Sequence, residues 1–228
     1  MKLPKALAFD VFGTVVDWRG GIAREAAPLL DSLGRADITP EAFADGWRAR
    51  YQPAMARVRS GERPFVILDA LHRETLEDLL VSLEIDPAAV GDERLDDLTL
   101  AWHRLDPWPD AVAGLTQLKR RFPIVTLSNG NIALMLDMAR RAALPWDAIL
   151  GAEVSGHYKP DPEAYLASAR ALAIQPDELC LVAAHIVTSL LRAAAGCSLL
   201  MSIARRNMAA ALRPTAHSRK SGNGTSAV

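Results

Sequence analysis

The sequence has few cysteines, almost no net charge and no long apolar run, and each of these deficits excludes a class of protein. Its 228 residues include only two cysteines, Cys180 and Cys197, which are too few for a disulfide framework and favour a reducing compartment. The formal net charge is −1, which gives no indication of a nucleic-acid or membrane partner. The apolar run after Lys2 and Lys5 is short and ends at Asp10, so we expect neither a signal peptide nor a membrane span. We therefore expect a cytoplasmic globular protein.

Acidic residues are missing from the last part of the chain. The segment from Leu179 to Val228 contains no Asp or Glu, although the whole chain has 27 of them. The basic residues of this segment are Arg192, Arg205, Arg206, Arg213, Arg219 and Lys220. This composition differs from that of the preceding sequence, so the segment needs an explanation of its own.

The first half of the chain contains one strand pattern followed by helical patterns. Residues 6–12, ALAFDVF, form a nearly continuous apolar run that ends at a Gly-Thr turn, as expected for a strand buried on both faces of a parallel sheet. Helical spacing then predicts helices over 21–34, 39–61, 66–83 and 92–105. Thr39 is a suitable N-cap, and Pro40 follows it at the first helical position. Pro53 is a point where the second of these helices kinks or divides.

The second half of the chain alternates between helices and strands. We expect helices over 110–121, 131–144 and 161–174, and strands over 123–130, 148–153 and 179–185. This alternation predicts an α/β fold with a doubly wound, Rossmann-like parallel sheet. Residues 1–17 and 106–203 would form this core, and residues 18–105 would form an inserted helical cap domain. Residues 198–203 would supply a late strand or helix, and residues 204–228 would form a loose tail.

Polar residues follow several of the predicted strands, and these strand ends should meet at one edge of the sheet. Asp10 and Thr14 follow the first strand, and Ser128 and Asn129 end a later one. Lys159 precedes a Pro-rich turn. Ligands bind outside the carboxyl ends of the strands in open parallel sheets, so we expect these side chains to form the active site.

In combination, the Asp-x-x-Gly-Thr turn, the Ser-Asn strand end and the Lys-Pro-Asp-Pro turn resemble the haloacid dehalogenase superfamily. The resemblance extends from about residue 5 to about residue 185. It implies that Asp10 is a nucleophile. Phosphatases of the superfamily carry a second aspartate two residues later, which protonates the leaving alkoxide. Here that position is Phe12, and a halide needs no proton to leave, so the site is suited to displacement at carbon.

The helical insertion resembles one branch of that superfamily. The string WRARYQ, which begins at Trp47, is similar to a Trp-Arg-x-(Lys/Arg)-Gln pattern of the type II L-2-haloacid dehalogenases. The resemblance implies that Arg48 faces the leaving halide, whereas an ordinary surface arginine is the alternative. Trp47, Tyr51 and Phe65 would form apolar walls of the substrate site together with Phe12, although residues at this helical spacing more often pack in a core.

The resemblance also implies roles for the remaining site residues. Asp10 would attack the halogen-bearing carbon with inversion and form an ester, which water would hydrolyse to a D-2-hydroxy acid. Lys159 would keep Asp10 ionised and oriented, unless it is an ordinary surface lysine. Thr14, Ser128 and Asn129 would hold the substrate carboxylate or a developing oxyanion.

Tyr165 matches an active-site tyrosine of the family, with core packing as the alternative.

The resemblance implies no metal and no cofactor. The partner would be a small-molecule 2-haloacid, and a homodimer is common in the family. A Mg²⁺-dependent phosphatase of the same superfamily and a non-catalytic fold relative are the competing hypotheses.

The acid-free segment falls where the superfamily carries its fourth catalytic loop, whose aspartate in the dehalogenases helps to position the hydrolytic water. Residues 185–188 are His, Ile, Val and Thr, and we assign no base chemistry to His185. When this segment is back-translated with GC-rich codons and read two bases later, one permitted product begins with H-R-D-L-A-A-A-R and so restores an aspartate. We therefore expect a shifted reading frame near residue 185, with a basic interaction tail as the functional alternative.

Overall fold

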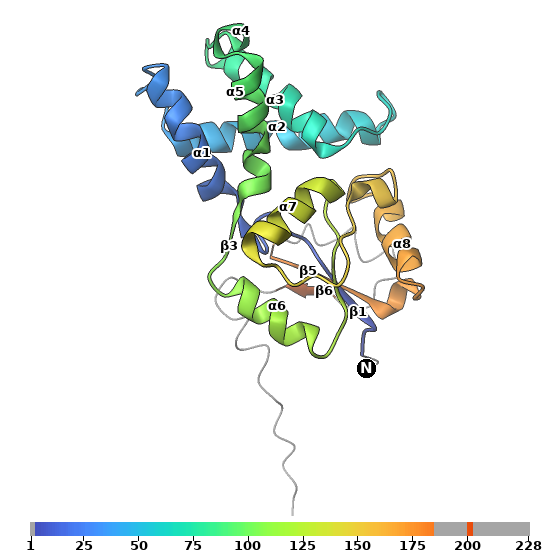
Figure 1. Cartoon of the computed structure of the whole chain (residues 1–228). Coiled ribbons are helices and arrows are strands. Elements are labelled where there is room, and N and C mark those ends of the chain that lie inside the picture. Colours follow the sequence, from blue (N-terminus) through green and yellow to red (C-terminus); the bar gives the residue numbers. More distant parts are fainter. Residues whose placement is uncertain (1–2, 185–199, 203–228) are drawn as a thin grey trace, which may run out of the picture.

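A parallel sheet forms the centre of the protein, and a block of helices is inserted after its first strand (Figure 1). The computed structural model describes residues 3–184 and 200–202. Its main sheet has the strand order β4-β1-β5-β6, and all three pairings are parallel. The first strand, β1 (Ala6–Phe9), lies between β4 and β5. The predicted α/β class is therefore confirmed.

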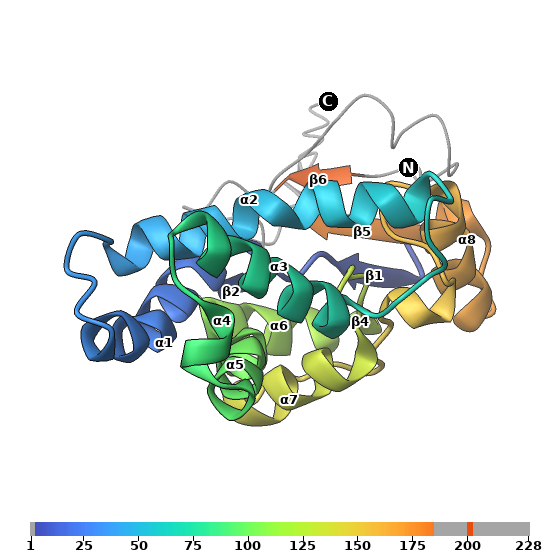
Figure 2. The same ribbon diagram turned by 90° about the horizontal axis from the view of Figure 1, so that it is seen from above.

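The inserted helices form a layer above the end of the sheet at which β1 leads into them (Figures 1 and 2). They are α1 (Trp18–Ser32), α2 (Pro40–Arg59), α3 (Leu68–Ser82), α4 (Pro87–Val90), α5 (Asp92–Thr99) and the 3-10 helix η1 (Leu100–Arg104). A two-residue strand precedes them, β2 (Val16–Asp17), and it pairs antiparallel with β3 (Asp106–Pro107), which follows them. The chain thus leaves and re-enters the core at adjacent positions. The Thr39 hydroxyl accepts the Ala42 amide as the predicted N-cap, and α2 continues through Pro53 undivided.

The rest of the core alternates as predicted, with one exception. Its elements are α6 (Ala111–Lys119), β4 (Ile124–Thr126), α7 (Ile132–Ala142), η2 (Ala152–Val154), α8 (Pro162–Ala171), η3 (Pro176–Glu178), β5 (Leu179–Ala183) and β6 (Leu200–Ser202). The last of these lies inside the predicted 198–203 element. The predictions on residues 185–199 and 203–228, including the shifted frame and the tail, concern residues outside the described ranges.

The prediction of a strand over 148–153 is wrong. This segment makes a single bridge to β4, between Ala148 and Val125, and the 3-10 helix η2 follows it. The Thr126 hydroxyl accepts the Leu150 amide at 2.8 Å and donates to the Leu150 carbonyl at 3.1 Å. Because a side chain takes the place of a backbone ladder there, the apolar run stays next to the sheet without becoming a strand.

Alternate residues of the strands enter two different hydrophobic clusters. Leu7, Phe9 and Val182 belong to the larger cluster, which also contains buried residues of α6 and α7. Ala6, Ala8, Val125 and Leu181 belong to a second cluster with residues of α8. Both faces of the sheet are therefore buried, which explains why its strands have continuous apolar sequences. Within the described part of the chain, no helix is long and apolar enough to cross a membrane.

Candidate active site

Asp10 directly follows β1, and a tight turn folds the next residues back onto its carboxylate. The Asp10 amide donates to the Val182 carbonyl at 3.0 Å and so continues the alignment with β5. Gly13 has a φ of 79°, in the left-handed region that favours glycine. The turn brings the Thr14 hydroxyl to Oδ2 of Asp10, to which it donates at 2.8 Å.

Lys159 holds the other oxygen of the same carboxylate. Its Nζ lies 2.8 Å from Oδ1 of Asp10 and 2.7 Å from the Leu127 carbonyl, and only 14% of the side chain is exposed. The Asn129 side chain fixes the backbone of this lysine, since its Oδ1 accepts the Lys159 amide at 2.7 Å. The structure thus brings together three predicted residues that are far apart in the sequence, and it gives Asn129 a positioning contact.

Ser128 and Gly130 form a close-packed turn after β4. Ser128 is buried, and its hydroxyl oxygen accepts the Gly130 amide at 3.0 Å. A Cβ atom on Gly130 would lie 2.4 Å from the Met135 side chain and 3.3 Å from the Phe12 ring. A side chain at this position would displace the end of Met135 and press on the Phe12 ring, so the loop packs closely against the Phe12 side of the site.

Arg48 points from α2 into a group of aromatic rings at the boundary between the insertion and the core. Its guanidinium carbon lies 3.9 Å from the ring centre of Tyr51, 5.3 Å from that of Trp18 and 5.9 Å from that of Phe12. Its Nη1 is buried and has no hydrogen-bond partner among the described residues. This geometry places an unpaired N–H donor of a cation near Phe12, two residues from Asp10.

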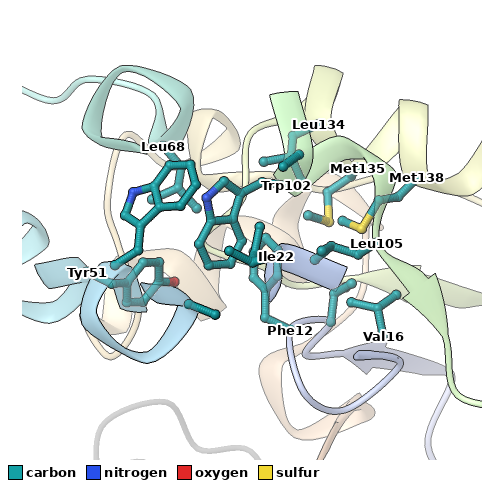
Figure 3. Packing of buried hydrophobic residues seen from close by; sticks show 14 of the residues in the cluster. Phe12, Val16, Ile22, Tyr51, Leu68, Trp102, Leu105, Leu134, Met135 and Met138 are labelled. Atoms are coloured by element: carbon teal, nitrogen blue, oxygen red, sulfur yellow. The ribbon is translucent and has the colours of Figure 1, made fainter. Parts of the chain in front are cut away.

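The same aromatic group contains two buried residues that the sequence analysis did not single out, His72 and Trp102. Their rings stack with centres 4.3 Å apart, and the Phe12 ring meets Trp102 edge-on at 5.8 Å. Figure 3 shows Phe12, Tyr51 and Trp102 in this cluster. Burial, and then the positive charge of Arg48, lower the pKa of His72 well below its usual value. His72 is therefore neutral, and Arg48 supplies the positive charge of the pocket.

Three other predicted residues lie in packing positions. The Trp47 indole is buried and donates to the His72 carbonyl and the Thr75 hydroxyl, both at 3.1 Å. Tyr165 is a buried member of the hydrophobic cluster beneath α8. Both side chains are therefore packed in the core, and their roles in the substrate site stay predictions. Phe65 packs against Tyr158, the neighbour of Lys159, with ring centres 5.4 Å apart, so it connects the insertion to the part of the core that carries Lys159.

A polar cluster that the sequence analysis missed joins the insertion to the core. His103 lies between two carboxylates, and one of these also bonds to Asn131, in the loop that carries Ser128 and Asn129. Its members are 34 and 62 residues apart, so no local motif indicates it. Within residues 3–184, no group of three or more His, Cys, Asp or Glu side chains is arranged to hold a metal ion.

A family model described as haloacid dehalogenase-like hydrolase matches residues 4–182. A curated protein of Burkholderia cepacia, (S)-2-haloacid dehalogenase 4A, is 29% identical over 184 residues, which cover 79% of this chain and 75% of the relative.

Two solved structures are more similar in sequence. The crystal structure of the defluorinating L-2-haloacid dehalogenase Rha0230 is 50% identical with a TM-score of 0.78, over 80% of this chain and 74% of that one. The L-2-haloacid dehalogenase PA0810 is 47% identical with a TM-score of 0.74, over 80% of this chain and 76% of that one. The chain therefore belongs to the haloacid dehalogenase-like hydrolase family and, within it, to the L-2-haloacid dehalogenases.

Proposed function

We propose that this protein hydrolyses short L-2-haloacids to D-2-hydroxy acids through an ester on Asp10. The observation that carries the proposal is the environment of that carboxylate. Lys159 and Thr14 each hold one of its oxygens at 2.8 Å, whereas Phe12 occupies the position at which a phosphatase has its proton donor. A fixed carboxylate without a neighbouring acid is suited to displace a leaving group that needs no proton.

In the first step, an oxygen of Asp10 forms a bond to the α-carbon of the substrate while the carbon–halogen bond breaks. The halogen leaves with the bonding electrons as halide, and attack from the opposite side inverts the carbon. Arg48 is the group that we assign to the departing halide, because its guanidinium lies near the Phe12 ring and its Nη1–H has no acceptor among the described residues. Donors fixed in a buried pocket stabilise such developing charge strongly.

The substrate carboxylate has candidate donors in the turn after β4. The Ser128 oxygen is oriented by the Gly130 amide, which leaves the hydroxyl proton available for a substrate oxygen. The backbone after Ser128 is fixed by the contacts of Asn129 with Lys159. We assign both residues to the substrate carboxylate, and Phe65 to the apolar wall.

In the second step, water attacks the carbonyl carbon of the Asp10 ester, and the hydroxy acid leaves with the oxygen that came from Asp10. The hydroxyl oxygen of the product therefore comes from Asp10, and the oxygen of the water stays in the Asp10 carboxylate. A single turnover in heavy-oxygen water should label Asp10 and leave the first product molecule unlabelled.

The deciding experiment measures halide release from L-2-chloropropionate in the presence of a chelator, together with the chirality of the lactate formed. We expect chloride and D-lactate in equal amounts. An Asp10→Asn variant, verified by mass as not deamidated, should release no chloride. Phosphate release from p-nitrophenyl phosphate that requires Mg²⁺, without chloride release, would instead favour the phosphatase alternative.

We also propose the domain limits 1–17 and 106–203 for the core and 18–105 for the cap. The β2–β3 pairing supports them, because it joins Asp17 to Asp106 at the two crossing points. A cytoplasmic location and a homodimer are further proposals, supported by the low cysteine content and by the family resemblance respectively. Size-exclusion chromatography with light scattering tests the second of these.

A further inference from the structure

A polar cluster holds the helical insertion against the catalytic loop of the core. Asp69 lies in the first turn of α3, and His103 lies in η1, shortly before the chain returns to the core. Asn131 precedes α7, two residues after Asn129, and Asp137 lies on α7. These four side chains, the carboxylate–histidine cluster, therefore come from both sides of the boundary.

Asn131 caps a helix of the insertion rather than its own helix. It occupies the N-cap position of α7 but makes no side-chain cap there. Its Oδ1 instead accepts the Asp69 amide at 3.3 Å, and its Nδ2 donates to the Asp69 carboxylate at 2.7 Å. The N-cap of α3 is Ile67, which has no side-chain oxygen to satisfy that amide. A core residue thus completes the start of α3, and it does so only when the insertion is docked.

The contacts of His103 indicate that its imidazole is protonated in this arrangement. Nδ1 lies 2.7 Å from Oδ2 of Asp137, and Nε2 lies 3.2 Å from Oδ1 of Asp69. A neutral imidazole would direct a lone pair at one of these carboxylates, whereas an imidazolium donates to both. Burial alone would lower the pKa of His103, but the hydrogen bonds and charges of Asp69 and Asp137 outweigh it, and the pKa lies above its usual value.

Other titratable groups near His103 do not replace these partners. His72, on α3, is neutral because burial lowers its pKa. Charged residues of the two other helices packed on η1, α1 and α5, include Glu25 and Asp97. Both pair with Arg104, the residue after His103.

We propose that Asp69, His103 and Asn131 are positioning residues for dehalogenation. They dock the insertion on the loop of Ser128 and Asn129, and thereby hold Arg48 near Phe12, two residues after Asp10. They act through these residues and need no contact with the substrate. The inference rests on the proposed function, because it assigns the cluster to the alignment of that reaction.

The test compares steady-state halide release by wild type and by Asp69→Asn, His103→Gln and Asn131→Asp, each with circular dichroism matching that of wild type. Asn131→Asp places a carboxylate opposite Asp69. We expect each change to lower kcat by about tenfold or more with KM changed much less, since Arg48 acts on the transition state. Glu74→Gln is the matched control on the same helix, because its partner Arg63 also belongs to the insertion. Its kcat should stay within about twofold of wild type, as for a surface pair.

The pH dependence distinguishes positioning from general stabilisation. The kcat of wild type should fall as pH rises through the elevated pKa of His103, and His103→Gln should lack this decrease. Asp137→Asn removes one of the two carboxylates, and its side chain is 58% exposed, so this variant should fold. As pH rises, the decrease in kcat should therefore begin at a lower pH in this variant than in wild type.

The inference would be overturned if all four cluster variants had the same kcat, KM and pH dependence as an active wild type that releases chloride. A decrease in Glu74→Gln equal to that in Asp69→Asn would overturn it as well. Absence of chloride release by wild type would instead contradict the proposed function.

Discussion

The Lys159 ammonium lies 2.8 Å from Oδ1 of Asp10, and it is itself held by the Leu127 carbonyl at 2.7 Å. Asn129 fixes the backbone of the same lysine. The Asp10 carboxylate, the proposed nucleophile, is therefore oriented by a cation that has little freedom to move. Such pre-organisation is more effective than a flexible surface ion pair, because little rearrangement is needed when the reaction begins.

Replacement of Lys159 by Met should lower kcat for chloride release by about 10²-fold or more, the scale of losing one fixed charged group at a reaction centre. The change removes the ammonium but keeps a long side chain. Lys119→Met is the matched control, since Lys119 pairs with Asp147 in a half-exposed position away from Asp10. Chloride release assays of both variants provide the measurement. Equal activity in the two would show that Asp10 needs no cation.

Arg48→Ala should lower kcat for halide release by about 10²-fold, because it removes the donor assigned to the leaving halide. Arg50→Ala is the control on the same helix, since Arg50 bonds to Gly46 and Ser82 and does not face the aromatic group. The decrease should be larger for poorer leaving groups, so chloro and bromo substrates should be compared. Retention of wild-type kcat with both substrates would remove Arg48 from the halide site.

Periodicity identified most elements of this fold because each has one structural environment. The β1 sequence is apolar at every position since both faces of the sheet are covered, and α2 begins at the Thr39-Pro40 signal. The strand predicted over 148–153 failed for a reason that no local pattern contains. Its pairing is replaced by two hydrogen bonds between the Leu150 backbone and the Thr126 hydroxyl, which belongs to a different segment.

The candidate site divides in the same way. Asp10 and Thr14 follow a predicted strand and Lys159 precedes a predicted turn, and the convergence of loops at the carboxyl ends of the parallel strands brings them together. His72 and Trp102 lie on insertion helices at positions that the sequence indicates only as core. Their proximity to Arg48 depends on how the helices pack, and the His103 cluster depends on docking across a boundary. Both required the tertiary structure.

His72 should make the protein less stable toward acid. Since burial lowers its pKa in the folded state, the unfolded chain binds a proton below about pH 6.5 that the folded chain does not bind. The free energy of unfolding should therefore decrease as pH falls, by at most about 1.4 kcal/mol per pH unit from this group. His72→Phe preserves an aromatic ring against Trp102 and removes the titration. Urea unfolding between pH 7 and pH 5 should show a smaller decrease in the variant, whereas parallel curves would mean that His72 is protonated in the folded protein.

The acid-free segment should limit the second half of the reaction. The Ala184 amide donates to the Thr14 hydroxyl at 3.0 Å, so the residue directly after β5 lies beside the turn that contacts Asp10. The family match ends at residue 182, within the first few residues of this segment, which supports the hypothesis of a shifted frame. The family resemblance implies an aspartate here that positions the hydrolytic water. Its absence should slow hydrolysis of the ester more than its formation.

Mass spectrometry of the intact protein mixed with L-2-chloropropionate tests this prediction. The chain as given should accumulate an adduct of the mass of the propionate ester and turn over slowly. A chain carrying H-R-D-L-A-A-A-R after Ala184, with the rest of the restored frame, should turn over faster without the adduct. The same restored chain with its aspartate changed to asparagine is the matched control, and it should accumulate the ester again, because general folding of the segment is retained while the carboxylate is lost. If the chain as given and the restored chain turn over equally and neither shows an adduct, the water is positioned by other groups, and the carboxylate after β5 is dispensable in this enzyme.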